Sequence, residues 1–273
     1  MRLSELGELG LLGELERRGL ARNIENDAAE LDDGRIVTQD ALVEDVHFKR
    51  DWISWRDLGF RAAAVNLSDL AASGADPEGL VVSLGLPGQT ELEDVLELYL
   101  GMAETGVPVI GGDTTAADRV YLSVTAVGRS ERVPGRDGAR PGDLIVVTGP
   151  LGAAGAAFRE NRLLRPPVRL EEGRSLARTA HAMLDISDGL ERDLERIAER
   201  SGVRCLIELE RVPLAQGATI EDLGFGEDYE LLAAVPSEAF HVIGRCEPGE
   251  GVELLRYGVP VELGGWDHFS QGH

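Results

Sequence analysis

The stretch Ala62-Ala63-Ala64-Val65-Asn66-Leu67-Ser68-Asp69-Leu70-Ala71-Ala72 decides the fold prediction, because it is an almost wholly apolar run that carries a single acid. Ser54, with Asp57 three residues later, is a plausible N-cap, so we predict a helix that starts there and runs through Leu70. An ordinary solvated charge is not expected inside such a helix. Asp69 is therefore a candidate functional residue.

Strand-like apolar runs lie on both sides of this helix. In the first half of the chain they cover residues 35–38, 80–86, 107–110 and 120–127. A second helix is predicted to start at Thr90, with Glu93 in the capping-box position. Leucines at mostly helical spacing between residues 3 and 15 predict a short amphipathic helix before the first strand. Strands and helices thus alternate along this half.

The Gly-, Pro- and Arg-rich stretch at residues 134–142 predicts a domain boundary. We place an N-terminal domain at residues 1–137 and a C-terminal domain at residues 138–273. The second domain repeats the pattern more loosely, with strands at 144–147, up to 184, near 205 and near 231, and with helices after 152 and from 189 to about 200. The prediction is an α/β or α+β protein of two domains.

Composition bounds the class of protein. The chain has 273 residues, 43% of them hydrophobic, which is enough for one large core or two medium ones. Its apolar runs are far shorter than the roughly 20 residues of a membrane helix. The N-terminus lacks the pattern of a secretory signal, so we expect a cytoplasmic protein without a membrane partner. Cys205 and Cys246 form no CxxC pair, which favours two buried reduced thiols over a disulfide or a zinc site.

The formal net charge of −22 argues against a nucleic-acid partner, because an acidic protein repels the phosphate backbone. The same repulsion would act on ATP, so a phosphorylated substrate could bind only where cations or local donors reverse the field. If the chain is a kinase, it should therefore hold several metal ions. A solvated acidic surface explains most of the 49 Asp and Glu residues.

Three further acids, Asp40, Asp113 and Asp185, follow apolar strand-like runs. Carboxylates at the carboxyl ends of several strands can converge in one cleft, which suits hard cations such as magnesium. A closing turn is an equally good interpretation of Asp40 or Asp113 when either is taken alone. Asp188 opens the sequence Asp188-Gly189-Leu190-Glu191, for which a helix capping box is the better interpretation when it is taken singly.

Two common phosphate-binding patterns are missing from the sequence. It has no GxxxxGK[ST] loop, and Lys49 is its only lysine, which excludes the P-loop and protein-kinase classes. Residues 149–155 follow a strand and are rich in glycine, but they lack the GxG spacing of a dinucleotide loop. A tight strand-to-helix turn is the better interpretation of this stretch.

Seven short motifs occur in order along nearly the whole chain. They are Leu3-Ser4-Glu5-Leu6-Gly7-Glu8, Asn66-Leu67-Ser68-Asp69-Leu70-Ala71-Ala72, Gly111-Gly112-Asp113-Thr114-Thr115, Gly135-Arg136-Asp137-Gly138-Ala139-Arg140-Pro141-Gly142-Asp143, Asp185-Ile186-Ser187-Asp188-Gly189-Leu190, Gly226-Glu227-Asp228-Tyr229-Glu230-Leu231 and Gly265-Trp266-Asp267-His268-Phe269. Together they resemble the thiamine-monophosphate kinase family.

The resemblance implies a two-domain ATP-binding fold of the aminoimidazole ribonucleotide synthetase type. In that fold the N-terminal domain has a mixed sheet, binds ATP and metal, and dimerises, and the C-terminal domain is α/β. The resemblance also implies an activity, the Mg²⁺-dependent phosphorylation of thiamine monophosphate by ATP to give thiamine diphosphate. A homodimer is the expected assembly.

The resemblance further implies a set of site residues. Magnesium would be bound by Asp27, Thr38, Asp40, Asp69, Asp113, Asp185 and Asp188. ATP would be contacted by Tyr99, Gly112, Asp113, Arg136 and Ser187. Thiamine monophosphate would be contacted by His47, Glu227 and Trp266. Packing roles remain open for Tyr99, His47 and Trp266.

The chemistry of the nucleophile suggests a mechanism without a catalytic base. A phosphate monoester has a second pKa of about 6, so its oxygen is already ionised at neutral pH. We therefore predict in-line transfer by positioning and charge neutralisation, with no covalent enzyme intermediate. Arg136 offers a planar fork of donors for phosphate oxygens, and Trp266 offers a flat face to a cationic thiazolium.

Departures from the family pattern leave alternatives open. Glu25-Asn26-Asp27 stands where Gly-Asp-Asp is usual, Gln39 stands where threonine is usual, and Phe225 replaces a glycine. One metal position is therefore predicted to be weakened or rearranged, and a degenerate homologue that binds nucleotide or metal without turnover is an alternative.

Another enzyme of the superfamily is the second alternative. Selenophosphate synthetase would need a reactive Cys or selenocysteine near the N-terminus, and the hydrogenase maturation protein would need a C-terminal Cys, yet Cys205 and Cys246 are the only cysteines. Both are disfavoured. Aminoimidazole ribonucleotide synthetase is a weak runner-up, because its glycine-lysine signature is missing.

Overall fold

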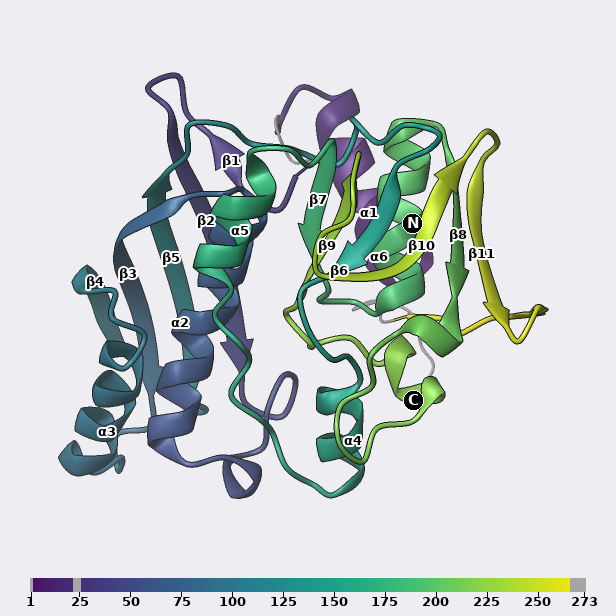
Figure 1. Cartoon of the computed structure of the whole chain (residues 1–273). Helices are drawn as coiled ribbons and strands as arrows, with labels where there is room; N and C mark the ends of the chain where they lie inside the picture. The colour runs from purple at the N-terminus through teal and green to yellow at the C-terminus, as the bar shows by residue number, and fades with distance from the viewer. Residues whose placement is uncertain (1, 22–25, 266–273) are drawn as a thin grey trace.

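The computed structural model describes residues 2–21 and 26–265, which form two β-sheets side by side (Figure 1). A five-stranded sheet belongs to the N-terminal half of the chain and a seven-stranded sheet to the C-terminal half. Both sheets contain parallel and antiparallel neighbours. The predicted two-part α/β fold with a mixed N-terminal sheet is confirmed, and the division between residues 137 and 138 stays a prediction.

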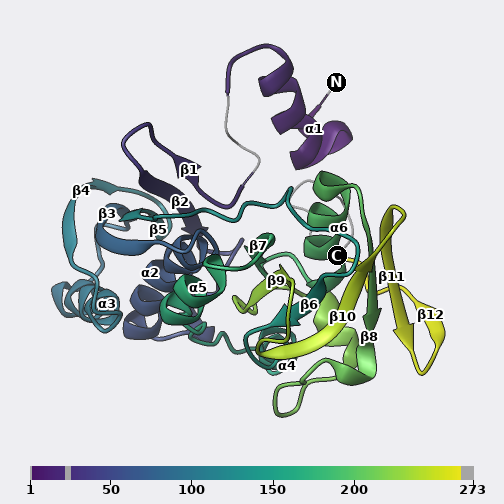
Figure 2. The same cartoon turned by 45° about the horizontal axis from the view of Figure 1, so that its top comes forward.

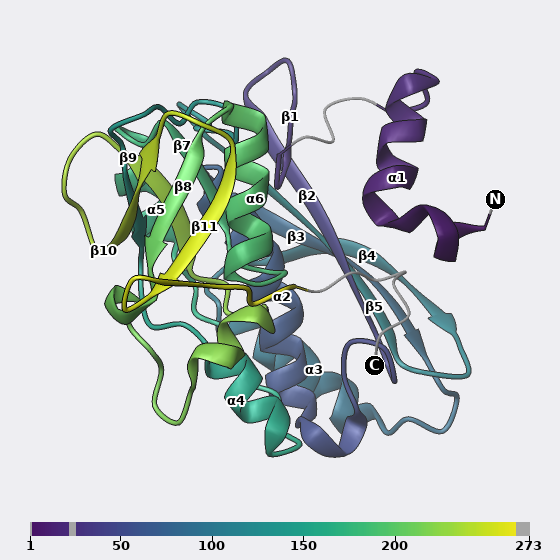
Figure 3. The same cartoon turned by 90° about the vertical axis from the view of Figure 1, so that its right-hand side faces the viewer.

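The N-terminal sheet has the strand order β1-β2-β5-β3-β4. Its strands are β1 (Ala29–Glu30), β2 (Arg35–Val43), β3 (Asp76–Leu86), β4 (Val109–Ala116) and β5 (Tyr121–Arg129). β3 and β4 are parallel and are joined by α3 (Leu92–Ala103), whereas the other neighbours are antiparallel. Figure 3 shows α2 (Trp55–Ala72) and α3 on one side of this sheet and α1 (Leu3–Arg17) on the other.

The inner strands of this sheet and its β4 edge differ in exposure. Alternate residues of the inner strands, such as Leu80, Val82 and Val124, are buried against α2, as expected for a sheet packed on one face. β4 forms one edge, and it is exposed from Ile110 to Ala116. A long exposed edge strand offers unpaired backbone groups to another chain.

The C-terminal sheet has the strand order β12-β11-β8-β10-β6-β9-β7. Its strands are β6 (Leu144–Val147), β7 (Ala182–Asp185), β8 (Arg204–Glu208), β9 (Leu231–Val235), β10 (His241–Glu247), β11 (Gly251–Arg256) and β12 (Val259–Val261). The remaining elements are α4 (Ala153–Arg159), α5 (Leu170–Ala177), α6 (Leu190–Ser201) and the short helices at Arg50–Trp52, Leu209–Arg211 and Ile220–Gly224. Figure 2 shows α6 and β12 in the C-terminal half.

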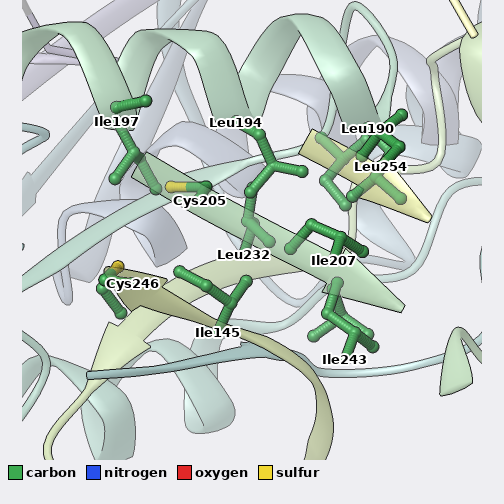
Figure 4. Close-up of a cluster of buried hydrophobic side chains, with 14 of the residues drawn as sticks. Ile145, Leu190, Leu194, Ile197, Cys205, Ile207, Leu232, Ile243, Cys246 and Leu254 are labelled. Atoms are coloured by element: carbon green, nitrogen blue, oxygen red, sulfur yellow. The ribbon is translucent and has the colours of Figure 1, made fainter. Parts of the chain in front are cut away.

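Helix α6 covers the C-terminal sheet with one apolar stripe. Leu190, Leu194 and Ile197 belong to the core over β8, and Figure 4 shows Ile197 and Leu194 near Cys205 and Leu190 near Leu254. Cys246 lies opposite Cys205 on β10, and both thiols are free and buried. The expectation of two buried reduced thiols is confirmed.

Helix α2 is buried on nearly all sides because it belongs to two cores. Leu67 and Leu70 pack in the core of the N-terminal sheet, while Ala71 and Ala72 pack with residues of the C-terminal sheet. α5 approaches α2 so closely that a Cβ on Gly173 would lie 2.2 Å from the Ala71 carbonyl oxygen. A helix that is apolar all round is the sequence expected for such a position.

The connection between α4 and α5 ties the two halves together; we name it the crossing segment (residues 160–169). Arg165 forms ion pairs with Asp57 of α2 and with Glu104 at the end of α3. Leu163 N–H donates to the Trp52 carbonyl at 3.3 Å. A segment of the C-terminal half thus lies against the N-terminal half.

Several predicted boundaries need correction. α3 starts at Leu92 after Glu91, without a side-chain cap, so the capping box predicted from Thr90 and Glu93 is wrong. Asp40 and Asp113 lie inside β2 and β4 and not in turns after them, because both strands continue beyond the apolar run. By contrast, the Ser54 cap is confirmed, since its Oγ accepts the Asp57 N–H at 3.0 Å.

Candidate active site

A cavity of about 930 Å³ lies between the two halves. Its volume suits a small-molecule site. Ten of the residues predicted to bind metal, ATP or substrate line it. They are Asp27, Thr38, Asp40, His47, Asp69, Arg136, Asp185, Ser187, Asp188 and Glu227. The structure therefore brings together side chains from distant parts of the sequence.

Three carboxylates come together at one end of the cavity; we call Asp27, Asp69 and Asp185 the acid cluster. One oxygen of each lies within 4.8 Å of those of the others, a spacing that could hold a metal ion. Thr38 Oγ1 donates a hydrogen bond to Asp69, and Ser68 Oγ donates one to Asp185 at 2.5 Å. Neighbouring hydroxyls thus orient two of the three acids.

The electrostatics of the acid cluster favour a cation. Burial, reinforced by the charges of Asp40 and Asp185, raises the pKa of Asp69 well above its ordinary value. Burial and the charge of Asp27 likewise raise the pKa of Asp185. Carboxylates crowded in this way repel one another when ionised, and a hard divalent cation with oxygen ligands relieves that repulsion. The donor set therefore fits Mg²⁺.

The acids do not converge for the reason the sequence suggested. Asp185 does lie at the end of a strand, β7, but Asp69 comes from near the C-terminal end of α2 and Asp40 from within β2. Asp40 N–H donates to Asn66 Oδ1 at 2.9 Å, so the side chain of Asn66 ties β2 to α2. The sequence motif that contains Asn66 does not predict this role.

The loop after β7 is organised by two residues that were not predicted. Asp193 accepts the backbone N–H groups of Ser187 and Asp188, each at 3.0 Å, and burial raises its pKa to about 7. Arg196 forms ion pairs with Asp193 and with Asp188. Gly189, without any side-chain cap, precedes α6, so Asp188 does not cap this helix. The capping-box interpretation of Asp188 is wrong.

Arg136 reaches the acid cluster from the segment between the two sheets. Its Nη2 forms an ion pair with Asp27, and its side chain is only 16% exposed. Burial by itself would lower the pKa of Arg136, but the Asp27 carboxylate raises it, so the guanidinium stays charged. A planar cation beside a potential metal site is well placed to bind phosphate oxygens.

The other end of the cavity is partly aromatic. Phe158 lies 5.3 Å from the ring of Trp52 and 4.8 Å from that of Phe225. Phe225, which replaces a family glycine, therefore contributes an aromatic side chain to the cavity wall. His47, which is close to Trp52 in sequence, also lines the cavity. Its Nδ1 accepts the Val43 N–H at 3.1 Å. The cavity thus has an acidic end and a more apolar one.

Three predicted residues that the structure describes do not line the cavity, and a fourth is not among the described residues. Gly112 and Asp113 are exposed on the edge strand β4. Tyr99 is half-buried on α3 and packs against the N-terminal core, as its packing interpretation requires. Trp266 lies outside the described residues. The ATP, metal and substrate roles of these four residues stay predictions.

The fold and the cavity define a class of protein that is also recognised by family models. The model for the AIR synthase related protein, N-terminal domain, matches residues 25–130, and the model for the C-terminal domain matches residues 140–253. Solved structures of the hydrogenase maturation protein HypE share the fold, with a TM-score of 0.70 at 21% identity for the complex with ATP.

Closer relatives identify the family. Thiamine-monophosphate kinase from Aquifex aeolicus is 35% identical, with 98% of this chain and 100% of the relative covered. The enzyme of that name from Escherichia coli is also 35% identical, with 86% of each chain covered. A solved structure described as AaThiL complexed with AMPPCP and TMP has a TM-score of 0.87, at 35% identity, and covers 98% of this chain and 99% of its own. The chain belongs to the thiamine-monophosphate kinase family.

Membrane insertion is addressed by one further observation. Over the part of the chain that the structure describes, no helix is both long and apolar enough to cross a membrane.

Proposed function

We propose that this protein transfers the γ-phosphoryl group of ATP to thiamine monophosphate, giving thiamine diphosphate and ADP. One observation carries the proposal: the acid cluster, Arg136 and Glu227 share one cavity in a chain 35% identical to a thiamine-monophosphate kinase over 98% of its length. We place the protein in the cytoplasm, where this reaction of thiamine diphosphate biosynthesis has its ATP.

Mg²⁺ is the metal that the donor set fits. Its proposed ligands are Asp27, Thr38, Asp40, Asp69, Asp113, Asp185 and Asp188. When bound, Mg²⁺ supplies positive charge that neutralises the phosphates of ATP and relieves repulsion in an acidic chain. ATP is the co-substrate, and Tyr99, Gly112, Asp113, Arg136 and Ser187 are proposed to contact it.

The residues of the chain act by holding two phosphates in line. A phosphate oxygen of thiamine monophosphate attacks the γ-phosphorus, a new P–O bond forms, and the bond to the β-phosphate oxygen of ATP breaks as ADP leaves. The attacking oxygen is already ionised at neutral pH, so no residue removes a proton. The buried guanidinium of Arg136 stabilises the charge that spreads over the transferred group.

The apolar end of the cavity suits the organic part of the substrate. Lys49 lies 4.6 Å from the Trp52 ring centroid, and Phe158 and Phe225 continue the aromatic wall. His47, Glu227 and Trp266 are proposed to contact thiamine monophosphate. Glu227 can accept hydrogen bonds from the substrate and balance the positive charge of the thiazolium.

A homodimer accounts for the residues that lie away from the cavity. Asp113 and Ala41 are at the same register level of the sheet but are separated by β5 and β3, a spacing of about 14 Å for three steps between strands. Asp113 is exposed on the edge strand. We propose that a second copy packs on this part of the sheet and that Asp113 of each copy completes the site of the other.

The test is product formation by the purified protein. Incubation with ATP, Mg²⁺ and thiamine monophosphate is expected to yield thiamine diphosphate and ADP in equal amounts, measured by chromatography. Omission of Mg²⁺ or of thiamine monophosphate should abolish both products. Formation of ADP alone, or of neither product by folded protein that binds ATP, would contradict the proposed function.

A degenerate binding protein is the competing proposal, and one contact favours it. Gln39, which replaces a family threonine, donates through Nε2 to Ser123 at 2.9 Å and accepts from Thr125 at 3.0 Å. These bonds hold the Gln39 amide against β5, next to the proposed ligands Thr38 and Asp40. Tight ATP binding without turnover would support this alternative.

A further inference from the structure

Helix α2 carries a buried cation, Arg61, two turns before Asp69. Its side chain is 2% exposed, and its Nη2 lies 2.5 Å from Glu227 Oε1. Its Nη1 donates to the Leu164 carbonyl at 3.1 Å, and its guanidinium lies over the Tyr229 ring, 5.7 Å from the centroid. A buried charge needs such partners, because leaving water costs more than a single contact returns. Arg61 therefore joins α2 to the loop that carries Glu227.

That loop holds Glu227 in a conformation unusual for its residue type. Glu227 and Tyr229 have φ values of 57° and 53°, in the left-handed region that non-glycine residues seldom adopt. Such backbone persists only when the surroundings fix it. The Glu227 N–H donates to the Ser187 carbonyl at 2.8 Å, and the Tyr229 N–H to Ile186 at 2.9 Å. The backbone is thus fixed against the loop after β7.

The loop also depends on close backbone approach. A Cβ on Gly226 would lie 2.3 Å from the Ser187 carbonyl oxygen, and Gly226 has a φ of 83°. Asp228 accepts the Gly152 N–H at 2.7 Å, which anchors the middle of the loop before α4. These bonds fix the backbone, whereas the Glu227 side chain, among the residues that the structure describes, is held by its ion pair with Arg61.

Arg61 and Asp69 lie on the same broad side of α2. Residues eight apart are about 12 Å apart along a helix axis and about 80° apart around it. Val65, midway between them, lines the cavity together with Asp69, Glu227 and Tyr229. One rigid helix therefore fixes the acid cluster at one end of the cavity and the support of Glu227 at the other.

We propose that Arg61 is a positioning residue that sets the direction of the Glu227 carboxylate and thereby the affinity for the organic end of the phosphate acceptor. This inference rests on the proposed function, in which Glu227 contacts thiamine monophosphate. Arg61 itself does not line the cavity. It acts through Glu227, and its removal should weaken binding of the acceptor but not of ATP.

The chemistry of arginine suits this position. Burial by itself would lower the pKa of Arg61, but the Glu227 carboxylate outweighs burial and raises it. Within residues 2–21 and 26–265, neither its Nε nor its Nη2 has a partner in hydrogen-bond geometry, so Nη2 holds Glu227 as an ion pair. A planar fork reaches Glu227 and the Leu164 carbonyl from one rigid group, whereas a lysine ammonium is a single point charge. Lys should therefore restore the charge but only part of the positioning.

The kinetic test compares Arg61→Met and Arg61→Lys with the wild type. Arg61→Met is expected to raise KM for thiamine monophosphate about tenfold and to leave KM for ATP within about twofold, because uniform acceptor binding is lost. Arg61→Lys should fall between the two, and it carries the test if Arg61→Met does not fold. An equal rise in both KM values would overturn the proposal.

A matched control comes from the crossing segment. Arg165 also joins the two halves of the chain, through Asp57 and Glu104, and packs its guanidinium 4.7 Å from the Phe60 ring centroid. It does not line the cavity. Arg165→Met is expected to change neither KM. A selective rise in acceptor KM in this variant would show that any loosened contact between the halves suffices, and would overturn a specific role for Arg61.

A double-mutant cycle and a structure separate positioning from activity. If Arg61 acts through Glu227, the variant with both Arg61→Met and Glu227→Gln should have the acceptor KM of Glu227→Gln alone, whereas multiplied effects would overturn the proposal. A crystal structure of Arg61→Lys should show the Glu227 carboxylate displaced, and an unmoved carboxylate would overturn it. The structural result stands even if the wild type fails to phosphorylate thiamine monophosphate, which would refute only the proposed function.

Discussion

Helix α2 and strand β4 each contain an acid with the same predicted role, but the two elements lie in opposite environments. Asp69 of α2 and Asp113 of β4 each lie in a short family motif, and each is a predicted magnesium ligand. α2 is buried between two cores, and Asp69 lies in the acid cluster. β4 is exposed along the sheet edge, and Asp113 does not line that cluster's cavity. A sequence motif identifies a functional type of residue, but it does not show which subunit of a dimer has that residue in its active site.

The largest expected effect is the loss of enzymatic activity when either acid is replaced. Asp69→Asn and Asp113→Asn should each lower kcat/KM by about 10³-fold, because each removes a charge that binds metal in the proposed site. Product formation at saturating Mg²⁺ measures the loss. Retention of activity in Asp113→Asn alone would break the comparison by showing that the exposed acid has no part in catalysis.

The next effect distinguishes action within one subunit from action across two. Heterodimers of Asp69→Asn and Asp113→Asn, isolated with two different affinity tags, should recover about half of the wild-type kcat per dimer, since one of two symmetric sites is then intact. If Asp113 acts in its own subunit, both sites remain damaged and no activity returns. Failure to isolate any mixed dimer would contradict the proposed assembly.

The smallest expected effect concerns stability without metal. Because the pKa of Asp69 is raised in the folded state, the folded chain holds protons that the unfolded chain has lost, and stability falls as pH rises above the ordinary Asp range. At pH 7.5 with EDTA, Asp69→Asn should therefore raise Tm by about 3 °C, roughly the shift for 1 kcal/mol in a protein of this size.

The exposed acid provides the control for that measurement. Asp113→Asn should leave Tm unchanged, since Asp113 is exposed. The gain for Asp69→Asn should shrink toward pH 4, because the raised pKa of Asp69 favours its neutral form there in the wild type. Added Mg²⁺ should stabilise the wild type and not Asp69→Asn. A lower Tm for metal-free Asp69→Asn would show that the acid cluster is not under repulsion.

The sequence predicted the residues of the site better than the reasons they meet. An acid inside an apolar helix was a strong signal, and Asp69 lies where that signal placed it. The apolar runs predict strands that end before Asp40 and Asp113, with a closing turn as an equal alternative for each, because polar residues in the second half of β2 and β4 conceal the strand pattern. Motif likeness supplied Asp27 and Arg136, which no local pattern marks.

The residues that support the site could not be predicted from the sequence. Asp193 and Arg196 are ordinary members of a charged helix until tertiary structure shows them holding the loop after β7. In the sequence, Arg61 directly precedes the apolar stretch of the helix and therefore resembles an exposed residue. Only the crossing segment and the Glu227 loop, distant in sequence, reveal that it is buried.

The sharing of α2 between two cores has a consequence for biosynthesis of the chain. α2 leaves the ribosome early, whereas the C-terminal strands that cover Ala71 and Ala72 are translated some 70 to 160 residues later. At about 5–20 residues per second, the apolar flank of the helix stays bare for several seconds. The newly made N-terminal half is therefore prone to aggregate through this exposed apolar flank. The flank is buried only when the C-terminal strands have been synthesised.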